Sequence, residues 1–259
     1  MTLHSASLHR PAVEILNASG SSPVVLLCEH ASNFIPPEYA GLGVPADELE
    51  RHIAWDIGAA DVTRTLAHLI DAPAFLGEYS RLLIDLNRPL TSPTSIVIRS
   101  ENTDIPGNAS LDATERAQRA TLYFEPFHHA VEQLLEERRR AGRPTLIVAI
   151  HSFTPTFHGD ARPWQAGIIY DKGTAFAEAT LDRLRLHDTA LNVGANVPYA
   201  VAPEDYYGLL VYGDYAHNPA LLVEIRQDLL ARPQQQDEWA HRLAAALAID
   251  IALGTLKQG

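Results

Sequence analysis

The chain has 259 residues, of which 46% are hydrophobic and 20% are charged. This length and composition suit one large α/β domain or two small ones, and they exclude a disordered or fibrous protein. The formal net charge of −12 argues against a nucleic-acid partner, because such a protein needs a basic face toward the phosphates.

Cysteine content and the N-terminal region limit the class of protein further. Cys28 is the only cysteine, which excludes a disulfide framework and a cysteine-rich zinc cluster. Residues 1–22 lack the continuous apolar segment of a signal peptide, and no apolar run is long enough to cross a membrane. We therefore expect a soluble, cytoplasmic protein in which residues 1–22 form an N-terminal extension.

The first part of the chain alternates between segments typical of strands and of helices. The predicted strands are 23–30, 73–77, 82–86 and 144–151. The predicted helices are 47–53, 56–70 and a helix that begins at Asp112, is kinked or split by Pro126 and ends at Gly142. Residues 91–108 show no periodicity, and a loop of this length in a compact domain is often functional.

The second part continues the alternation. Strands are predicted at 167–170 and 221–225 and helices at 174–186 and 236–253, while the loop 198–219 is rich in tyrosine. No internal repeat or low-complexity linker interrupts this order. The pattern predicts a single α/β domain over residues 23–259, with a mostly parallel or mixed central sheet covered by helices.

Two histidines stand at the carboxyl ends of the two most apolar predicted strands, His30 and His151. Ligands of open α/β sheets bind beyond the carboxyl ends of strands, so these side chains are expected to meet in one crevice. A single histidine at a strand end is more often structural than functional. The matching pair indicates a metal site or part of an acid/base site.

Three acidic residues are candidates for the same crevice. Asp56 is a candidate third metal ligand, although it could also cap the helix that follows it. Glu29 is an alternative ligand, but strand alternation places it on the opposite face from His30. Glu224 lies in an apolar run, where it is either a tuned general base or the partner of Arg226 in an internal ion pair.

Arg81 and Arg88 flank the short apolar stretch 82–84, and Arg88 directly follows Asn87. Guanidinium groups bind carboxylates through two parallel hydrogen bonds, and the amide of Asn87 could add a donor. Arg81 and Arg88 could therefore hold an acidic substrate. The alternative is ion pairing at the surface with Glu78 and Asp85.

An ordered set of motifs now resembles a known family, the N-formylglutamate amidohydrolases. The motifs are Cys28-Glu-His30-Ala-Ser, Tyr79-Ser-Arg81 followed by Asp85-Leu-Asn87-Arg88, Ile150-His151-Ser152, and His217 seven residues before Glu224. The likeness spans roughly residues 23 to 230, and its specificity lies in the ordered set rather than in one motif. Several of these segments are also similar to those of zinc carboxypeptidases and aspartoacylase-type deacylases. The resemblance implies a zinc-dependent exopeptidase-like fold.

The resemblance further implies a metal centre with one zinc ion. His30 and His151 would be zinc ligands, and Glu224 would be the catalytic base. Carboxypeptidase-like enzymes carry a glutamate three residues after the first histidine, whereas this chain has Asn33 there. Asp56 is the nearest acidic candidate in a matching motif, and we take it as the expected third ligand.

The same resemblance implies how a substrate is held. Asn87 and Arg88 would bind its α-carboxylate, and Arg81 would polarise the scissile carbonyl and stabilise its oxyanion. Ser152 and His217 would complete the substrate-binding residues. The loop before Glu224 carries tyrosines instead of an extra basic residue, so the requirement for a glutamate side chain is expected to be loose.

The expected function is therefore a metal-dependent amidohydrolase that cleaves the acyl group, formyl above all, from an N-acyl amino acid such as N-formylglutamate. One alternative is a binding module that holds an acidic metabolite without turnover. A second is a related zinc deacylase or carboxypeptidase with a different substrate. A cysteine hydrolase using Cys28 and His30 is disfavoured, because residues two apart on a strand make a poor hydrogen-bonding pair.

Overall fold

The computed structural model describes residues 10–171, 175–202, 206–214 and 216–256, which are built around a seven-stranded mixed sheet. Its strand order is β1-β3-β2-β6-β11-β9-β10. The strands are β1 Val13–Leu16, β2 Val24–Cys28, β3 Ala74–Gly77, β6 Leu146–Phe153, β9 Ala166–Ile169, β10 Val193–Ala195 and β11 Ala220–Arg226. The four central strands β3, β2, β6 and β11 are parallel, whereas β1 is antiparallel to β3 and β9 to β11.

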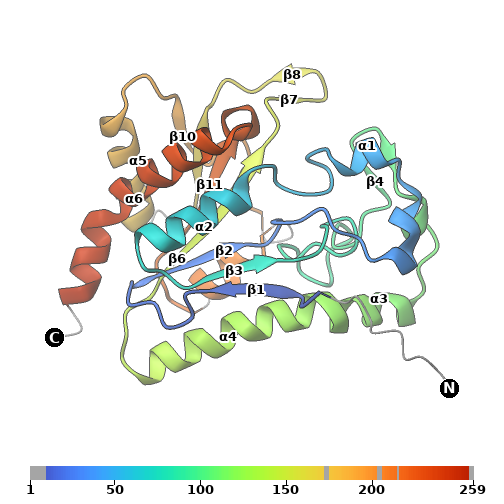
Figure 1. The fold of residues 1–259 in the computed structure, drawn as a ribbon, viewed down its shortest axis with the longest axis horizontal. Helices are drawn as coiled ribbons and strands as arrows, with labels where there is room; N and C mark the ends of the chain where they lie inside the picture. The colour runs from blue at the N-terminus through green and yellow to red at the C-terminus, as the bar shows by residue number, and fades with distance from the viewer. Residues whose placement is uncertain (1–9, 172–174, 203–205, 215, 257–259) are drawn as a thin grey trace.

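Helices cover both faces of the sheet and produce two apolar cores (Figure 1). One face packs against α2 (Ala59–Leu69), α5 (Ala175–His187) and α6 (Pro233–Leu256). The other packs against α4 (Glu125–Arg140) and the π-helical turn Ala120–Phe124 that precedes it. The prediction of a helix-covered mixed sheet is confirmed.

Smaller elements lie in the connections between these strands and helices. They are α1 (Ala46–Leu49), α3 (Ala113–Arg119), and the two-stranded hairpins β4–β5 (Arg99–Ser100 and Thr103–Asp104) and β7–β8 (Thr156–Phe157 and Asp160–Ala161). The β4–β5 hairpin lies within the loop 91–108.

One predicted strand is wrong. Residues 82–86 are buried as an apolar strand would be, but they form successive turns. The Ser80 hydroxyl accepts from the Leu82 N–H, and Asp85 Oδ1 accepts from the Asn87 N–H 2.8 Å away. Because these side chains satisfy the backbone locally, the apolar run needs no neighbouring strand.

Two strands of the central sheet were not predicted, β1 and β10. They are only four and three residues long and form the two edges of the sheet. Segments this short show too little alternation to stand out from a loop. The consequence is that residues 13–16, expected within an N-terminal extension, form part of the sheet through pairing with β3.

The helices follow the predicted order, with shifted ends. Asp112 accepts from the Glu115 N–H at 2.8 Å and begins α3, and Gly142 adopts φ +66° just after α4. Pro126 does not split the helix, which is continuous from 113 to 140, and the wider π-helical turn just before it accommodates the missing N–H. Among the described residues, none of the helices combines the length and apolar composition needed to cross a lipid bilayer.

Candidate active site

The candidate site lies where the connections of the sheet change direction. From β2 the chain goes to β3 on one side and returns later to β6 on the other side of β2. Such a switch point leaves a crevice between the carboxyl ends of two neighbouring parallel strands. His30 stands two residues beyond the end of β2, and His151 lies near the end of β6. The sheet topology therefore brings together two residues that are 121 positions apart in the sequence.

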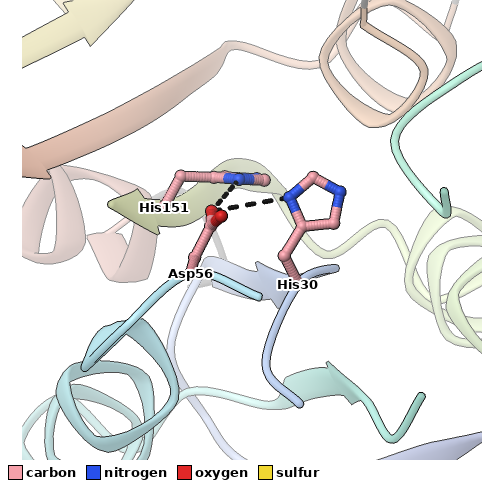
Figure 2. Close-up of side chains that lie close together, drawn as sticks. All are labelled: His30, Asp56 and His151. Carbon is pink, nitrogen blue, oxygen red and sulfur yellow. Dashed lines mark hydrogen bonds and ion pairs between the residues drawn. The ribbon is translucent and has the colours of Figure 1, made fainter. Parts of the chain in front are cut away.

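His30, Asp56 and His151 form a compact buried cluster (Figure 2). One nitrogen or oxygen from each residue lies within 4.8 Å of those of the other two. Asp56 Oδ2 is 2.8 Å from His151 Nδ1 and 3.5 Å from His30 Nδ1. Two imidazoles and a carboxylate at this spacing form a donor set typical of catalytic zinc.

The turn before α2 directs Asp56 into the cluster. Its N–H donates to the His30 carbonyl 2.9 Å away, which joins the segments that carry His30 and Asp56 directly. Gly58 follows with φ +80°, and a Cβ there would lie 2.5 Å from Leu230 Cβ, so this tight turn requires glycine. Gly58, not Asp56, is the N-cap of α2, and the alternative role of Asp56 as a helix cap is therefore wrong.

Each of the two histidine rings has a further buried carboxylate at its second nitrogen, Nε2. His30 Nε2 donates to Asp85 Oδ1 at 2.7 Å, and His151 Nε2 donates to Glu29 Oε2 at 3.0 Å. Burial opposes ionisation of both acids, but the histidine contacts outweigh it and lower the pKa of Glu29 and of Asp85. With Nε2 committed as the donor, the second nitrogen of each ring, Nδ1, faces the cluster, where His151 Nδ1 is 2.8 Å from Asp56 Oδ2 and His30 Nδ1 has no hydrogen-bond partner among the described residues.

Arg81 connects the acidic residues of the cluster. Its guanidinium lies 3.3 Å from Asp56 Oδ1 and 2.9 Å from Asp85 Oδ2, and its side chain is 25% exposed. The pairing with Asp85 considered from the sequence is therefore present, but inside the site and not on the surface. Glu78 pairs instead with Arg10, 3.8 Å away.

Glu224 lies beside the cluster on β11, in register with His151 on β6. Its Oε2 is buried and has no hydrogen-bond partner among the residues described here. Burial raises the pKa of Glu224 to about 7, although the charge of His151 opposes the shift. The alternative of an internal ion pair with Arg226 is wrong, because that guanidinium binds Asp228 with Nε 2.7 Å from Oδ1.

The buried Glu224 carboxyl predicts a pH-dependent cost to stability in the metal-free protein. Its pKa is higher in the folded chain than the unfolded value of 4.5, so its neutral form favours folding below that pH. This advantage is lost as the pH rises through about 7. We expect Glu224→Gln to gain roughly 3 kcal/mol in stability relative to the unmutated chain between pH 4.5 and pH 8.

The measurement is urea denaturation of both chelator-treated proteins across this pH range. The quantity to compare is how the unfolding free energy of each protein changes with pH. The cost of burying the glutamine amide does not depend on pH and therefore cancels. If the difference in unfolding free energy between the two proteins does not vary with pH, the pKa of Glu224 is not raised in the folded chain and this prediction is wrong.

The cluster opens into a cleft with a volume of about 620 Å³. Asn87 and Arg88 line it, as do residues of the loop 91–108, namely Thr94, Val97, Arg99, Ser100 and Glu101. Asn87 Oδ1 accepts from the Tyr207 and Gly208 N–H groups, so donation by Nδ2 is the contact left for a substrate. The predicted carboxylate-binding pair is thus part of the same cleft as the His-Asp-His cluster.

Ser152 and His217 are placed differently from each other. Ser152 lines the cleft, where its hydroxyl donates to the Ile57 carbonyl at 2.9 Å and its N–H donates to Asp56 Oδ2 at 3.3 Å. His217 is not in the cleft. It precedes the start of β11, at the opposite edge of the sheet, and lines a separate cavity of about 830 Å³. We therefore leave His217 out of the substrate site.

Sequence reasoning missed the roles of Glu29 and Asp85. Alternation put Glu29 on the face opposite His30, but β2 ends at Cys28 and both following residues are in a turn, where alternation no longer applies. The signal that could have found both acids is chemical, since a ligating imidazole usually donates its second nitrogen to a carboxylate.

Tyr199 is a further cleft residue that the sequence did not single out from the other tyrosines. Its hydroxyl accepts from Arg162 Nη1 at 2.9 Å, and the same guanidinium stacks over its ring at 4.7 Å. Burial raises the pKa of this phenol, with Glu224 contributing in the same direction. Tyr199 therefore stays neutral beside the acidic cluster.

Cys28 has no access to the cleft. The side chain is fully buried, and burial raises the pKa of its thiol well above the ordinary value. A nucleophilic cysteine needs the opposite, an accessible thiol with a lowered pKa. The structure thus opposes the cysteine hydrolase and agrees with a packing role for Cys28.

Comparisons with known proteins agree with this geometry. The profile of the N-formylglutamate amidohydrolase family matches residues 22–231. The chain is 38% identical to the crystallised gene product Atu2144 from Agrobacterium tumefaciens, with a TM-score of 0.86 over 93% of this chain and 96% of that one. An N-formylglutamate amidohydrolase from Ralstonia eutropha JMP134 is 17% identical and shares the fold, with a TM-score of 0.64 over 96% of this chain and 99% of that one. A search of curated proteins gave no match. The family match covers most of the chain and all of the site, so the chain belongs to the N-formylglutamate amidohydrolase family.

Proposed function

We propose that this protein is a zinc-dependent amidohydrolase that removes a small acyl group, formyl above all, from an N-acyl amino acid such as N-formylglutamate. The observation that carries the proposal is the buried cluster of His30, Asp56 and His151 with the raised-pKa carboxyl of Glu224 in the same cleft. Family membership supports the amide hydrolysis.

The residues of the cluster fit a zinc ion. His30 Nδ1 is buried and has no hydrogen-bond partner among the described residues, as expected for an atom that keeps its lone pair for a metal. Three protein ligands would leave one position open, which is typical of catalytic zinc. When bound, zinc would lower the pKa of a water molecule and polarise the amide carbonyl.

Glu224 is the proposed general base. Its carboxylate would take a proton from the attacking water and then deliver it to the departing amine nitrogen. A pKa near neutrality suits both transfers, because the group can hold and release a proton at little cost. The apolar neighbours of Glu224 on β11, Val223 and Ile225, are buried and keep solvent from the strand.

Arg81 and the pair Asn87 and Arg88 divide the recognition of the substrate. Arg81 uses two of its five N–H donors on Asp56 and Asp85, so others can donate to the developing oxyanion. Arg88 and Asn87 Nδ2 would hold the α-carboxylate. A small acyl group would then lie against the cluster, with the amino-acid side chain toward the loop 91–108.

The expected result of metal analysis is about one zinc per chain, lost on substitution of a ligand. His30→Ala, His151→Ala and Asp56→Ala should each lower zinc content and activity together, because each removes one of three ligands. The matched control is His52→Ala, which removes a histidine that lines the same cleft outside the cluster and should retain zinc. The measurement is elemental analysis beside a panel of N-acyl amino acids assayed for released acid and amine.

Full turnover by the metal-free protein would overturn the zinc-dependent mechanism. Stoichiometric zinc without turnover of any N-acyl amino acid would overturn the proposed substrate class. Tight binding of an acidic metabolite with neither metal nor turnover would favour the non-catalytic binding module.

A further inference from the structure

Glu29 is a buried acid for which the proposed reaction has no direct use. Its side chain is 1% exposed, and Oε2 accepts from His151 Nε2 at 3.0 Å. It lies on the side of the ring opposite Asp56, which contacts Nδ1. Glu29 therefore contacts a proposed zinc ligand without being in the ligand cluster itself.

Backbone from a distant segment confines this carboxylate. A Cβ placed on Gly208 would lie 2.6 Å from Glu29 Oε1, closer than atoms of real side chains approach. Glycine is needed at this position for close approach, not for an unusual φ. The next atom near this Cβ is Leu27 Cδ1 at 3.5 Å, so a side chain at position 208 would meet the Glu29 carboxylate first.

The segment that carries Gly208 is itself tied to the substrate-binding residues. Asn87 Oδ1 accepts from the N–H groups of Tyr207 and Gly208 at 3.0 and 3.2 Å. The Asn87 N–H donates to Asp85 Oδ1, 2.8 Å away, which also accepts from His30 Nε2. These contacts form one chain from one histidine of the cluster, through Asn87 and Gly208, toward the other histidine.

We propose that Glu29 is the positioning residue for His151, and that close packing of Gly208 holds Glu29 in place. The inference rests on the proposed zinc function. It predicts that residues 207–208 contribute to metal affinity although neither is a ligand. A Gly208 side chain would displace the Glu29 carboxylate, and His151 would lose the partner that fixes its tautomer and ring orientation.

The test compares zinc affinity by competition with a chelator in the full-length protein. We expect Glu29→Ala to weaken zinc binding by about 10- to 100-fold, the usual effect of removing a carboxylate behind a ligating histidine. Glu29→Gln keeps an acceptor oxygen and should lose less. Gly208→Ala removes no polar group and should still weaken binding by roughly 10-fold, through displacement of Glu29. Glu132→Ala, which removes an exposed glutamate on α4, should leave affinity unchanged.

A spectroscopic readout separates positioning from general loss of structure. In ¹⁵N-histidine-labelled protein, the His151 Nε2–H should give a downfield, slowly exchanging proton resonance, with and without zinc. Glu29→Ala should abolish it, whereas thermal unfolding of the metal-free variants reports on folding.

The possible outcomes are distinguishable. Weaker zinc binding by both Glu29→Ala and Gly208→Ala, with loss of the resonance, supports the proposal. Unchanged zinc affinity in folded variants overturns it while leaving the zinc function intact. Failure of the unmutated protein to bind zinc overturns the proposed function, and the inference falls with it.

Discussion

Glu224→Gln is expected to lower kcat by about 100-fold or more while zinc remains bound. Glutamine keeps the shape and polarity of the side chain but cannot accept the proton of the attacking water. Glu224 is buried in register with His151 and is outside the His-Asp-His cluster, so its loss should not remove a ligand. The measurement is steady-state kinetics with elemental analysis of the same preparation.

The pH dependence of the unmutated enzyme supplies an independent check. Because the base must be ionised, kcat/KM should rise with pH as Glu224 loses its proton, and Glu224→Gln should lose that rise. The metal-free pKa is about 7, and a bound cation would move the rise to lower pH.

Glu101→Gln is the matched control for the loss of a carboxylate. Glu101 lines the same cleft, but its Oε2 is 2.7 Å from Arg51 Nη2, so it has no role in the proposed proton transfer. Zinc loss in Glu224→Gln would make Glu224 a ligand, and unchanged turnover would make it structural.

The part of the site that could be predicted from sequence follows from strand ends. Two apolar runs that each end in histidine predict neighbouring parallel strands, and the switch point between β2 and β6 makes His30 and His151 converge. Asp56 could be proposed as an acidic residue before a predicted helix that follows His30 in the chain. Only the structure, with its turn at Gly58, shows that the Asp56 side chain points into the cluster.

The other parts of the site depend on long-range contacts, which local sequence patterns do not predict. The turns at 82–86 place Asp85 behind His30, although the apolar residues of this run are typical of a strand. Arg119 on α3 is buried and donates to the Leu83 carbonyl at 3.0 Å and to Asn108 Oδ1 at 2.7 Å. These hydrogen bonds join both ends of the segment 83–108 to α3. Such pairings join residues far apart in the sequence, and no helix or strand period reports them.

His217 shows why a motif spacing alone can mislead. It precedes Glu224 by seven residues, which is the length of β11, so one residue lies before the strand and the other near its carboxyl end. His217 lies in a turn before the strand, and the four steps from Ala220 to Glu224 at about 3.3 Å each add roughly 13 Å of strand between that turn and Glu224. Spacing along an extended strand therefore separates residues that the same spacing on a helix would bring together.

Arg88→Ala is expected to weaken catalysis on N-acyl amino acids by roughly 2 to 4 kcal/mol, the scale of a lost charged hydrogen-bonded pair in a desolvated site. The reason is the proposed grip of Arg88 and Asn87 on the α-carboxylate in the cleft. N-formyl amino-acid amides lack that carboxylate. They should therefore be poor substrates for the unmutated enzyme and change little on mutation.

The measurement is kcat/KM for acid and amide substrates on both enzymes, arranged as a double-mutant cycle. Arg99→Ala is the control, because it removes an arginine from the outer wall of the same cleft and should affect acid and amide alike. Equal losses on acid and amide in Arg88→Ala would mean that Arg88 supports the fold or the oxyanion. The α-carboxylate would then have to be bound by other donors of the cleft.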